Sequence, residues 1–234
     1  GGACSCDRTP IAEWAARRGG PWDDAVVPQQ RLKARLRRAL TEGPVTPALR
    51  VAWAVAGLLL FFSVYGGVGL LTAGGAADAT LLPLPIDAWV PFMPVGTLAY
   101  VALYPQVLAP LFLVEDRRML LRGASAYLLM IAISVPVWVL MPVTVHRIPV
   151  PVEDLFTWGL RVTRAVDPPT NCFPSMHVAE SFCAAFVVGR CDKRLGRAML
   201  VIATLIWWST MALGQHWFVD GVAGLLVAVV VDRL

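Results

Sequence analysis

The sequence predicts an all-α membrane protein, a polytopic bundle of six transmembrane helices with short amphipathic helices at the membrane surface. Its composition favours this class, because the 234 residues are 57% hydrophobic and only 15% charged, and the mean hydropathy is +0.64. A soluble domain is usually about 45–50% apolar and about 25% charged. Apolar content on this scale excludes intrinsic disorder. The five cysteines show no framework spacing, which excludes a disulfide scaffold.

Six segments are candidate spans, since a transmembrane helix needs about 20 mostly apolar residues. Three of them carry no charge and cover residues 51–77, 88–114 and 123–145. Three more, at 175–189, 198–215 and 214–231, carry polar residues near one end. Ionisable residues within a span are costly and indicate a functional site.

Lysine and arginine in the short loops predict the orientation, because cytoplasmic loops carry an excess of them. They gather before the first span, between the second and third, and between the fourth and fifth: Arg31, Lys33, Arg35, Arg37, Arg38, Arg50, Arg117, Arg118, Arg122, Arg190, Lys193, Arg194 and Arg197. We therefore expect an integral protein of the plasma or inner membrane with both termini in the cytoplasm. The loop at 146–174, on the outer side, also carries arginines.

Residues 1–46 are predicted to form a cytoplasmic segment, followed by a membrane domain at 47–234. Within the segment, residues 31–40 place leucines at i, i+4 and i+8 among basic residues. This pattern is typical of an amphipathic helix on the inner leaflet, and a solvated helix is an equal alternative. We expect no cleavable signal peptide, because no apolar run precedes residue 50. The formal charge of +4 is interpreted as lipid contact, with no nucleic acid as a partner.

The first polar motif reads Asn171-Cys172-Phe173-Pro174-Ser175-Met176-His177, where a loop enters the fourth span. Amides in the first turn of a helix, together with the helix dipole, favour an anion. Ser175 adds a hydroxyl and His177 adds a group that titrates near neutrality. Capping of the helix is the structural alternative for Ser175, and Asn171 is more readily a turn residue than a ligand.

The second motif runs from Ser209 to Asp220. His216 and Asp220 are four residues apart, so on a helix that opens the last span they share a face. A carboxylate beside an imidazole fixes the tautomer and leaves the other nitrogen as a base or nucleophile. Ser209 is a candidate phosphate ligand, with a hydrogen bond back to its own helix as the alternative.

Arginines of the outer loop complete the predicted site. Arg147 follows the third span, and Arg161 with Arg164 lies at i, i+3 in an interfacial helix predicted at 154–166. Guanidinium groups bind phosphate oxygens well. Snorkelling is the alternative for Arg147, and contact with lipid headgroups is the favoured interpretation of the pair. Metal binding fits less well, because Asp220 is more naturally the group that orients His216 and no H-E-x-x-H motif is present.

These motifs resemble the type-2 phosphatidic acid phosphatase superfamily over residues 95–234. That family shows K-x6-R-P, then P-S-G-H, then S-R-x5-H-x3-D. Here the second element reads 174–177, and the third reads Ser209-Thr210, five residues, His216, three residues and Asp220. Met176 replaces the glycine and Thr210 the arginine. In the first element Arg147 matches the arginine, but Leu140 stands at the lysine.

The resemblance implies a membrane enzyme that transfers phosphoryl groups of lipid phosphate esters at the outer face through a phosphohistidine on His216. Asp220 would orient the ring, and His177 would act as the acid and then the base. Arg147, Ser175, Ser209 and the amides near Met176 would bind the phosphate, and Arg161 or Arg164 would replace the missing arginine. No metal or cofactor is implied. We expect His177 and His216 to face each other across a gap one phosphate wide.

The acceptor decides between two enzyme activities. The lead-in at 171–175 and the Ser209-Thr210 pair resemble the branch with inositol phosphorylceramide synthases. This resemblance favours transfer of an alcohol-phosphate headgroup, similar to inositol phosphate, to a polyol or lipid-alcohol acceptor. A phosphatase that uses water on phosphatidic acid or a polyprenyl phosphate is the alternative. A transporter of anionic lipids is an alternative of another class, but inverted repeats and broken helices are not apparent. The sequence leaves the oligomeric state open.

Overall fold

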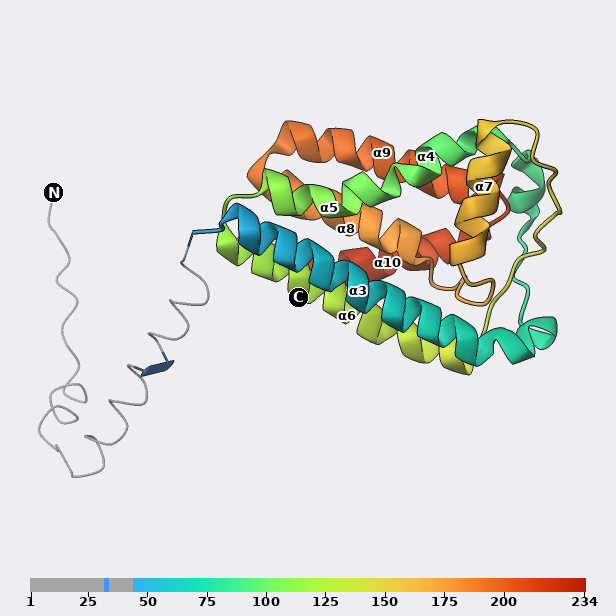
Figure 1. Cartoon of the computed structure of the whole chain (residues 1–234), viewed down its shortest axis with the longest axis horizontal. Coiled ribbons are helices and arrows are strands. Elements are labelled where there is room, and N and C mark those ends of the chain that lie inside the picture. Colours follow the sequence, from blue (N-terminus) through green and yellow to red (C-terminus); the bar gives the residue numbers. More distant parts are fainter. Residues whose placement is uncertain (1–31, 34–43) are drawn as a thin grey trace, which may run out of the picture. The chain divides into compact units, whose positions relative to one another are not determined.

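Figure 1 shows the computed structural model, which describes residues 32–33 and 44–234. Internal contacts divide the chain into Gly1–Pro44 and Val45–Leu234, and every element discussed below belongs to the second unit. The amphipathic helix predicted at 31–40 therefore lies outside the described residues, apart from the helical pair Leu32 and Lys33.

The described part of the second unit is helical, as predicted, and its pairing between extended segments is limited to isolated bridges. The α-helices are α3 (Pro47–Thr72), α4 (Thr97–Val101), α5 (Leu103–Leu113), α6 (Arg117–Leu140), α7 (Leu155–Val166), α8 (Met176–Cys191), α9 (Lys193–Ala212) and α10 (Phe218–Arg233). Three short 3₁₀ helices join α3 to α4: η1 (Ala73–Asp78), η2 (Pro85–Trp89) and η3 (Pro94–Gly96).

Four of the six predicted spans are confirmed as helices long and apolar enough to cross a membrane. They cover Pro47–Ala76, Pro94–Leu113, Arg117–Leu140 and Lys193–Ala212. The other two predicted spans correspond to α8 and α10, which have 16 residues each. A helix of that length extends about 24 Å, less than the roughly 30 Å of a hydrocarbon core. The count of six therefore remains a prediction.

Helix α8 occupies the interior of the bundle, with α5, α6, α9 and α10 packed around it. Its side chains are buried along nearly the whole length, including apolar residues such as Val178, Ala179 and Ala185. Small residues let its neighbours approach closely: a Cβ added to Gly196 on α9 would lie 2.3 Å from the Cα of Gly189 on α8. The buried position of α8 explains why a short helix suffices there.

Helix α7 confirms a helix where the sequence predicted an interfacial one, and it crosses the end of the bundle where α8 begins (Figure 1). Asp154 caps it by accepting a hydrogen bond from the amide of Thr157 at 2.8 Å. One face of α7 exposes large apolar side chains, including Leu155, Trp158 and Val162. This face suits contact with the membrane surface.

Candidate active site

The site lies where the first turn of α8 meets the loop before α10. The amide of Ser175 donates to the carbonyl of Asp220 at 3.0 Å, which ties the two predicted motifs together. Helix α10 packs closely against the start of α8, because a Cβ at Gly224 on α10 would lie 2.3 Å from the carbonyl oxygen of Ser175. The Ser175 hydroxyl is fully buried and has no hydrogen-bond partner among residues 32–33 and 44–234. Close packing of α10 on α8 thus brings the two sequence motifs to one place.

His216 lies just before α10 instead of on its first turn, where the sequence placed it. Gly214 adopts a positive φ of 59°, and the amide of His216 donates to the carbonyl of Thr210 at 3.2 Å. Asp220 caps α10, because its Oδ2 accepts from the amide of Trp217 at 2.8 Å. The same oxygen lies 3.4 Å from Nδ1 of His216. The expected contact between His216 and Asp220 therefore exists, but it is made by the turn at Gly214 and the helix cap at Asp220 and not by two residues of one helix.

The contacts of His216 fix its tautomer. Nδ1 lies 3.0 Å from the carbonyl oxygen of Cys172, and a carbonyl can only accept a hydrogen bond. Nδ1 therefore carries a proton, which leaves Nε2 as the lone-pair nitrogen of the neutral ring. Nε2 faces Nδ1 of His177 at 3.1 Å. The two rings thus touch directly, closer than the phosphate-wide gap expected from the sequence.

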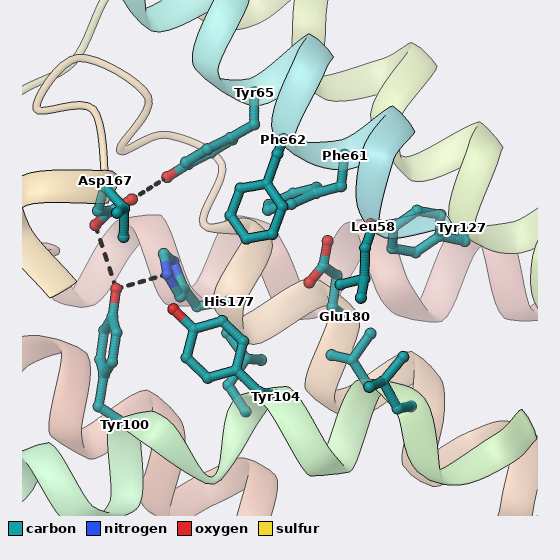
Figure 2. A pocket seen from close by; sticks show the side chains of 14 residues that line it. Leu58, Phe61, Phe62, Tyr65, Tyr100, Tyr104, Tyr127, Asp167, His177 and Glu180 are labelled. Carbon is teal, nitrogen blue, oxygen red and sulfur yellow. Dashed lines mark hydrogen bonds between the residues drawn. The ribbon is translucent and has the colours of Figure 1, made fainter. Parts of the chain in front are cut away.

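The other nitrogen of His177 joins a second polar group that the sequence analysis did not identify. Nε2 of His177 lies 2.6 Å from the hydroxyl of Tyr100 on α4, which also lies 3.2 Å from Oδ2 of Asp167. Oδ1 of Asp167 accepts from the hydroxyl of Tyr65 at 2.5 Å. Figure 2 shows this chain of hydrogen bonds from Tyr65 through Asp167 and Tyr100 to His177. The only sequence signal was indirect: Arg147 needs an acidic partner, and Asp167 is an acid in the same loop.

The guanidinium of Arg147 forms an ion pair with Asp167. It donates to the Asp167 carbonyl at 2.9 Å and lies 3.4 Å from the carboxylate. Arg164 donates to the carbonyls of Ile148 and Leu213 at 2.6 and 2.9 Å. Partial burial, followed by the nearby charge of Arg147, lowers the pKa of Arg164. Arg161 is exposed on α7. The structure therefore gives Arg147 and Arg164 protein partners, and the predicted role of all three in phosphate binding remains untested.

The remaining predicted ligands are buried at this end of the bundle. Asn171 donates to the carbonyl of Tyr65 at 2.8 Å, and its Oδ1 has no hydrogen-bond partner in the part of the chain that the structure describes. The hydroxyl of Ser209 donates back to the carbonyl of Ile206 in its own helix at 2.7 Å, which was the structural alternative. Met176 is buried in the first turn of α8. For these residues phosphate binding stays a prediction.

Three side chains group closely enough to be considered for a metal ion. Ligand atoms of Cys172, His216 and Asp220 lie within 4.8 Å of one another. Burial, and then the charges of Asp220 and Asp167, raise the pKa of the Cys172 thiol, which therefore stays protonated. The nitrogen of His216 that faces this group carries a proton. Zinc ligands must be deprotonated, so an ion bound here would displace the proton of the thiol and that of the ring.

Comparison with known proteins identifies the family pattern in the half of the chain that carries these residues. Residues 123–234 match the PAP2 superfamily. The match spans α6 to α10 and includes His177, His216 and Asp220. No curated protein and no solved structure matches the chain. Members of the PAP2 superfamily are phosphatases and phosphotransferases, so the match supports a membrane enzyme, while Tyr65 and Tyr100 lie outside the matched residues.

Proposed function

We propose that this protein is a phosphoryl-transfer enzyme for lipid phosphate esters, with His216 as the nucleophile and the outer membrane face as the site of reaction. One observation carries the proposal. His216 donates its Nδ1 proton to the backbone and directs Nε2 at a second imidazole 3.1 Å away, and both rings are buried. Transfer of an alcohol-phosphate headgroup to a polyol or lipid alcohol is the reaction we favour, and water as the acceptor gives the phosphatase.

In the proposed reaction the phosphate enters between the two rings. Nε2 of His216 forms a bond to phosphorus while the bond to the leaving oxygen breaks, and that oxygen takes the proton from Nδ1 of His177. In the second half, Nδ1 of His177 takes a proton from the acceptor hydroxyl. The acceptor oxygen then bonds to phosphorus as the P–N bond breaks. In-line attack from about 3 Å and a hydrogen bond of about 2.8 Å to the leaving oxygen require the rings to separate by roughly 3 Å or more.

Charge is stabilised on both sides of the transferred group. The imidazolium of phosphorylated His216 keeps its Nδ1 proton between the Cys172 carbonyl at 3.0 Å and the Asp220 carboxylate at 3.4 Å. The buried hydroxyl of Ser175 has no partner within the described chain and is available to the phosphate oxygens. Donors aimed at developing charge in a water-excluded site are among the strongest sources of catalysis.

Tyr100 and Asp167 are positioning residues in this scheme. To act as the acid, His177 must be protonated at both nitrogens, so its Nε2 donates to the Tyr100 oxygen at 2.6 Å. Tyr100 then turns its own proton toward Asp167 Oδ2 at 3.2 Å. After proton transfer the ring is neutral, and the same contacts hold its orientation.

The distribution of basic residues supports the outer face. The turns at the end of the bundle opposite the site carry the arginines and lysines that connect α5 to α6 and α8 to α9, namely Arg117, Arg118, Arg190, Lys193, Arg194 and Arg197. Short loops rich in these residues remain on the cytoplasmic side. The site end of the same helices therefore faces outward in the proposed topology.

Sidedness is tested with thiol labelling of intact cells. Cys191 is exposed at the basic end, whereas Cys172 and Cys183 are buried. In a variant with serine at positions 4 and 6, an impermeant maleimide should label Cys191 only after the membrane is permeabilised. Introducing a cysteine at Ile148, which is 61% exposed at the site end, should allow labelling of intact cells. The reverse pattern contradicts an outer-face site.

The reaction is tested with a lipid phosphate labelled on phosphorus and reconstituted protein in nanodiscs. Quenching in alkali should trap label on the protein, because phosphohistidine survives alkali and is lost in acid. Products formed with and without added polyols or lipid alcohols distinguish transfer from hydrolysis, and activity should persist in a chelator. Turnover that never places label on the protein contradicts the phosphohistidine.

A further inference from the structure

Two adjoining cavities extend from the catalytic histidine into the bundle. The first, of about 250 Å³, is lined by His177, Asp167 and Tyr100 at one end, and we call it the site cavity. The second, of about 390 Å³, lies among α3, α5, α6 and α8, and we call it the inner cavity. Residues shared by the two linings make them neighbours: Leu58, Val107, Leu108, Tyr127 and Glu180.

The combined space has the dimensions and lining of a site for one hydrocarbon chain. Along α8 it extends from His177 to Val187, ten residues or about 15 Å of helix. That is half the thickness of a hydrocarbon core of roughly 30 Å. Leu58 and Phe62 on α3 and Tyr104 on α5 line the site cavity and are also 37–46% exposed, so the space opens between these helices on the lipid-facing side.

One buried polar group interrupts this apolar lining. Glu180 is 5% exposed, belongs to both linings and points into the site cavity (Figure 2). The Tyr127 hydroxyl interacts with its carboxyl group, but Oε1 has no hydrogen-bond partner among the residues that the structure describes. A buried carboxyl oxygen without a donor is costly. The proposed reaction does not use this group.

From these observations we infer that the cavities bind a hydrocarbon chain of the lipid phosphate and that Glu180 accepts a hydrogen bond from a hydroxyl or amide N–H next to the headgroup. This inference rests on the proposed function. Glu180 lies at i+3 from His177, and side chains so related have Cβ atoms about 5–6 Å apart. The donor should therefore be on the second or third carbon from the phosphate. Lipid phosphates whose chains carry only esters or only hydrocarbon lack this donor.

The test measures binding apart from turnover. The His216→Ala protein in nanodiscs is titrated with dodecyl phosphate and with its analogue that bears one hydroxyl on the third carbon. We expect the hydroxylated probe to bind about tenfold more tightly, an effect within the range of one hydrogen bond. Adding Glu180→Leu should reduce this ratio to about one. Glu180→Gln, which keeps an acceptor oxygen, should retain most of it. Equal binding of the two probes, or a ratio that Glu180→Leu leaves unchanged, overturns the assignment.

The chain site has its own test at Gly57, which lines the inner cavity and has open space where a Cβ would be. In the same background, Gly57→Leu should weaken binding of dodecyl phosphate about tenfold and that of butyl phosphate much less. Gly67→Leu is the matched control, because Gly67 lies on the same helix with equal space and lines neither cavity. Equal effects of Gly57→Leu on the two chain lengths overturn the placement of the chain.

The two proposals fail separately. If the hydroxylated probe binds with the expected preference but wild-type protein neither transfers nor hydrolyses its phosphate, the proposed function fails and the binding site stands. If wild-type protein turns over both probes while the His216→Ala protein shows no preference, the role of Glu180 fails and the enzyme stands.

Discussion

The two ends of α8 hold their polar side chains in opposite ways. At the first turn, Ser175 and His177 are 0% and 7% exposed, and His216 beside them is 3% exposed. At the last turn, Arg190 pairs with Asp232 on α10, and these side chains are 31% and 19% exposed. Both ends join α8 to α10, but one does so with buried, ordered groups and the other with a partly solvated ion pair.

The two ends of α8 therefore differ in how much stability is lost to the burial of polar groups. Burying imidazoles and carboxylates is unfavourable unless each has a partner, yet at the first turn Ser175 Oγ and Asp220 Oδ1 have none within the described part of the chain. Partly exposed ion pairs contribute little to stability, and in the proposed topology the charges at the last turn lie on the cytoplasmic side. Substitutions at the first end should therefore affect catalysis, and those at the second end should affect little else than topology.

The largest effect is expected at the nucleophile. His216→Ala should lower turnover by about 10³-fold or more, since the bond to phosphorus can no longer form. Turnover of a labelled lipid phosphate measures the loss, and circular dichroism checks that the helices persist. His146→Ala is the matched control, because this histidine is exposed and should retain full activity. Activity retained by His216→Ala would show that His216 is not the nucleophile and that the buried end of α8 is not the site of reaction.

Next in size is the effect of the buried carboxylate that the sequence did not reveal. Asp167→Asn leaves Arg147 without its counter-ion and weakens the contacts with Tyr65 and Tyr100. We expect unfolding to become easier by about 3 kcal/mol, the usual consequence of breaking a buried pair. Thermal unfolding in detergent measures this. The control is Glu153→Gln, the same chemical change at an exposed site of the same loop, and an equal loss there would contradict the contrast.

A smaller effect is expected at the hydroxyl that orients His177. Tyr100→Phe removes the group 2.6 Å from Nε2 but leaves the aromatic ring in place. We expect kcat to fall about tenfold, as for loss of a hydrogen bond of about 1.4 kcal/mol, with KM nearly unchanged. Steady-state kinetics on one lipid phosphate provides both constants. A rise in KM without a fall in kcat would show that Tyr100 contacts substrate and does not position the acid.

The smallest effect is expected at the opposite end of α8. Asp232→Asn should change the free energy of unfolding by less than about 1 kcal/mol, because the pair is partly solvated. Turnover should stay at the wild-type value. A loss comparable to that of Asp167→Asn would mean that the two ends of the helix are equally important for stability.

The sequence was most informative where chemistry is local. Residues 175–177 and 216–220 could be recognised because a helix entrance and an i, i+4 pair bring their members together within a few positions. A helix at 154–166 was also predicted correctly, since helix formation there depends on neighbouring residues, whereas its position at the membrane surface stays a prediction. The predicted span count depended on hydropathy alone, and hydropathy does not distinguish a helix that faces lipid from one, such as α8, that is surrounded by protein.

Long-range contacts explain what the sequence left undecided. Tyr100 and Asp167 are 67 positions apart, and Glu180 becomes notable only because helices from four parts of the chain enclose it. Composition and spacing alone determined a helical membrane protein with two histidines and an aspartate in a recognisable pattern. Tertiary packing decided that the two rings touch, which nitrogen of His216 carries the proton, and which buried oxygen lacks a partner. Those properties depend on distances of a few ångströms between distant segments, and only the folded chain sets such distances.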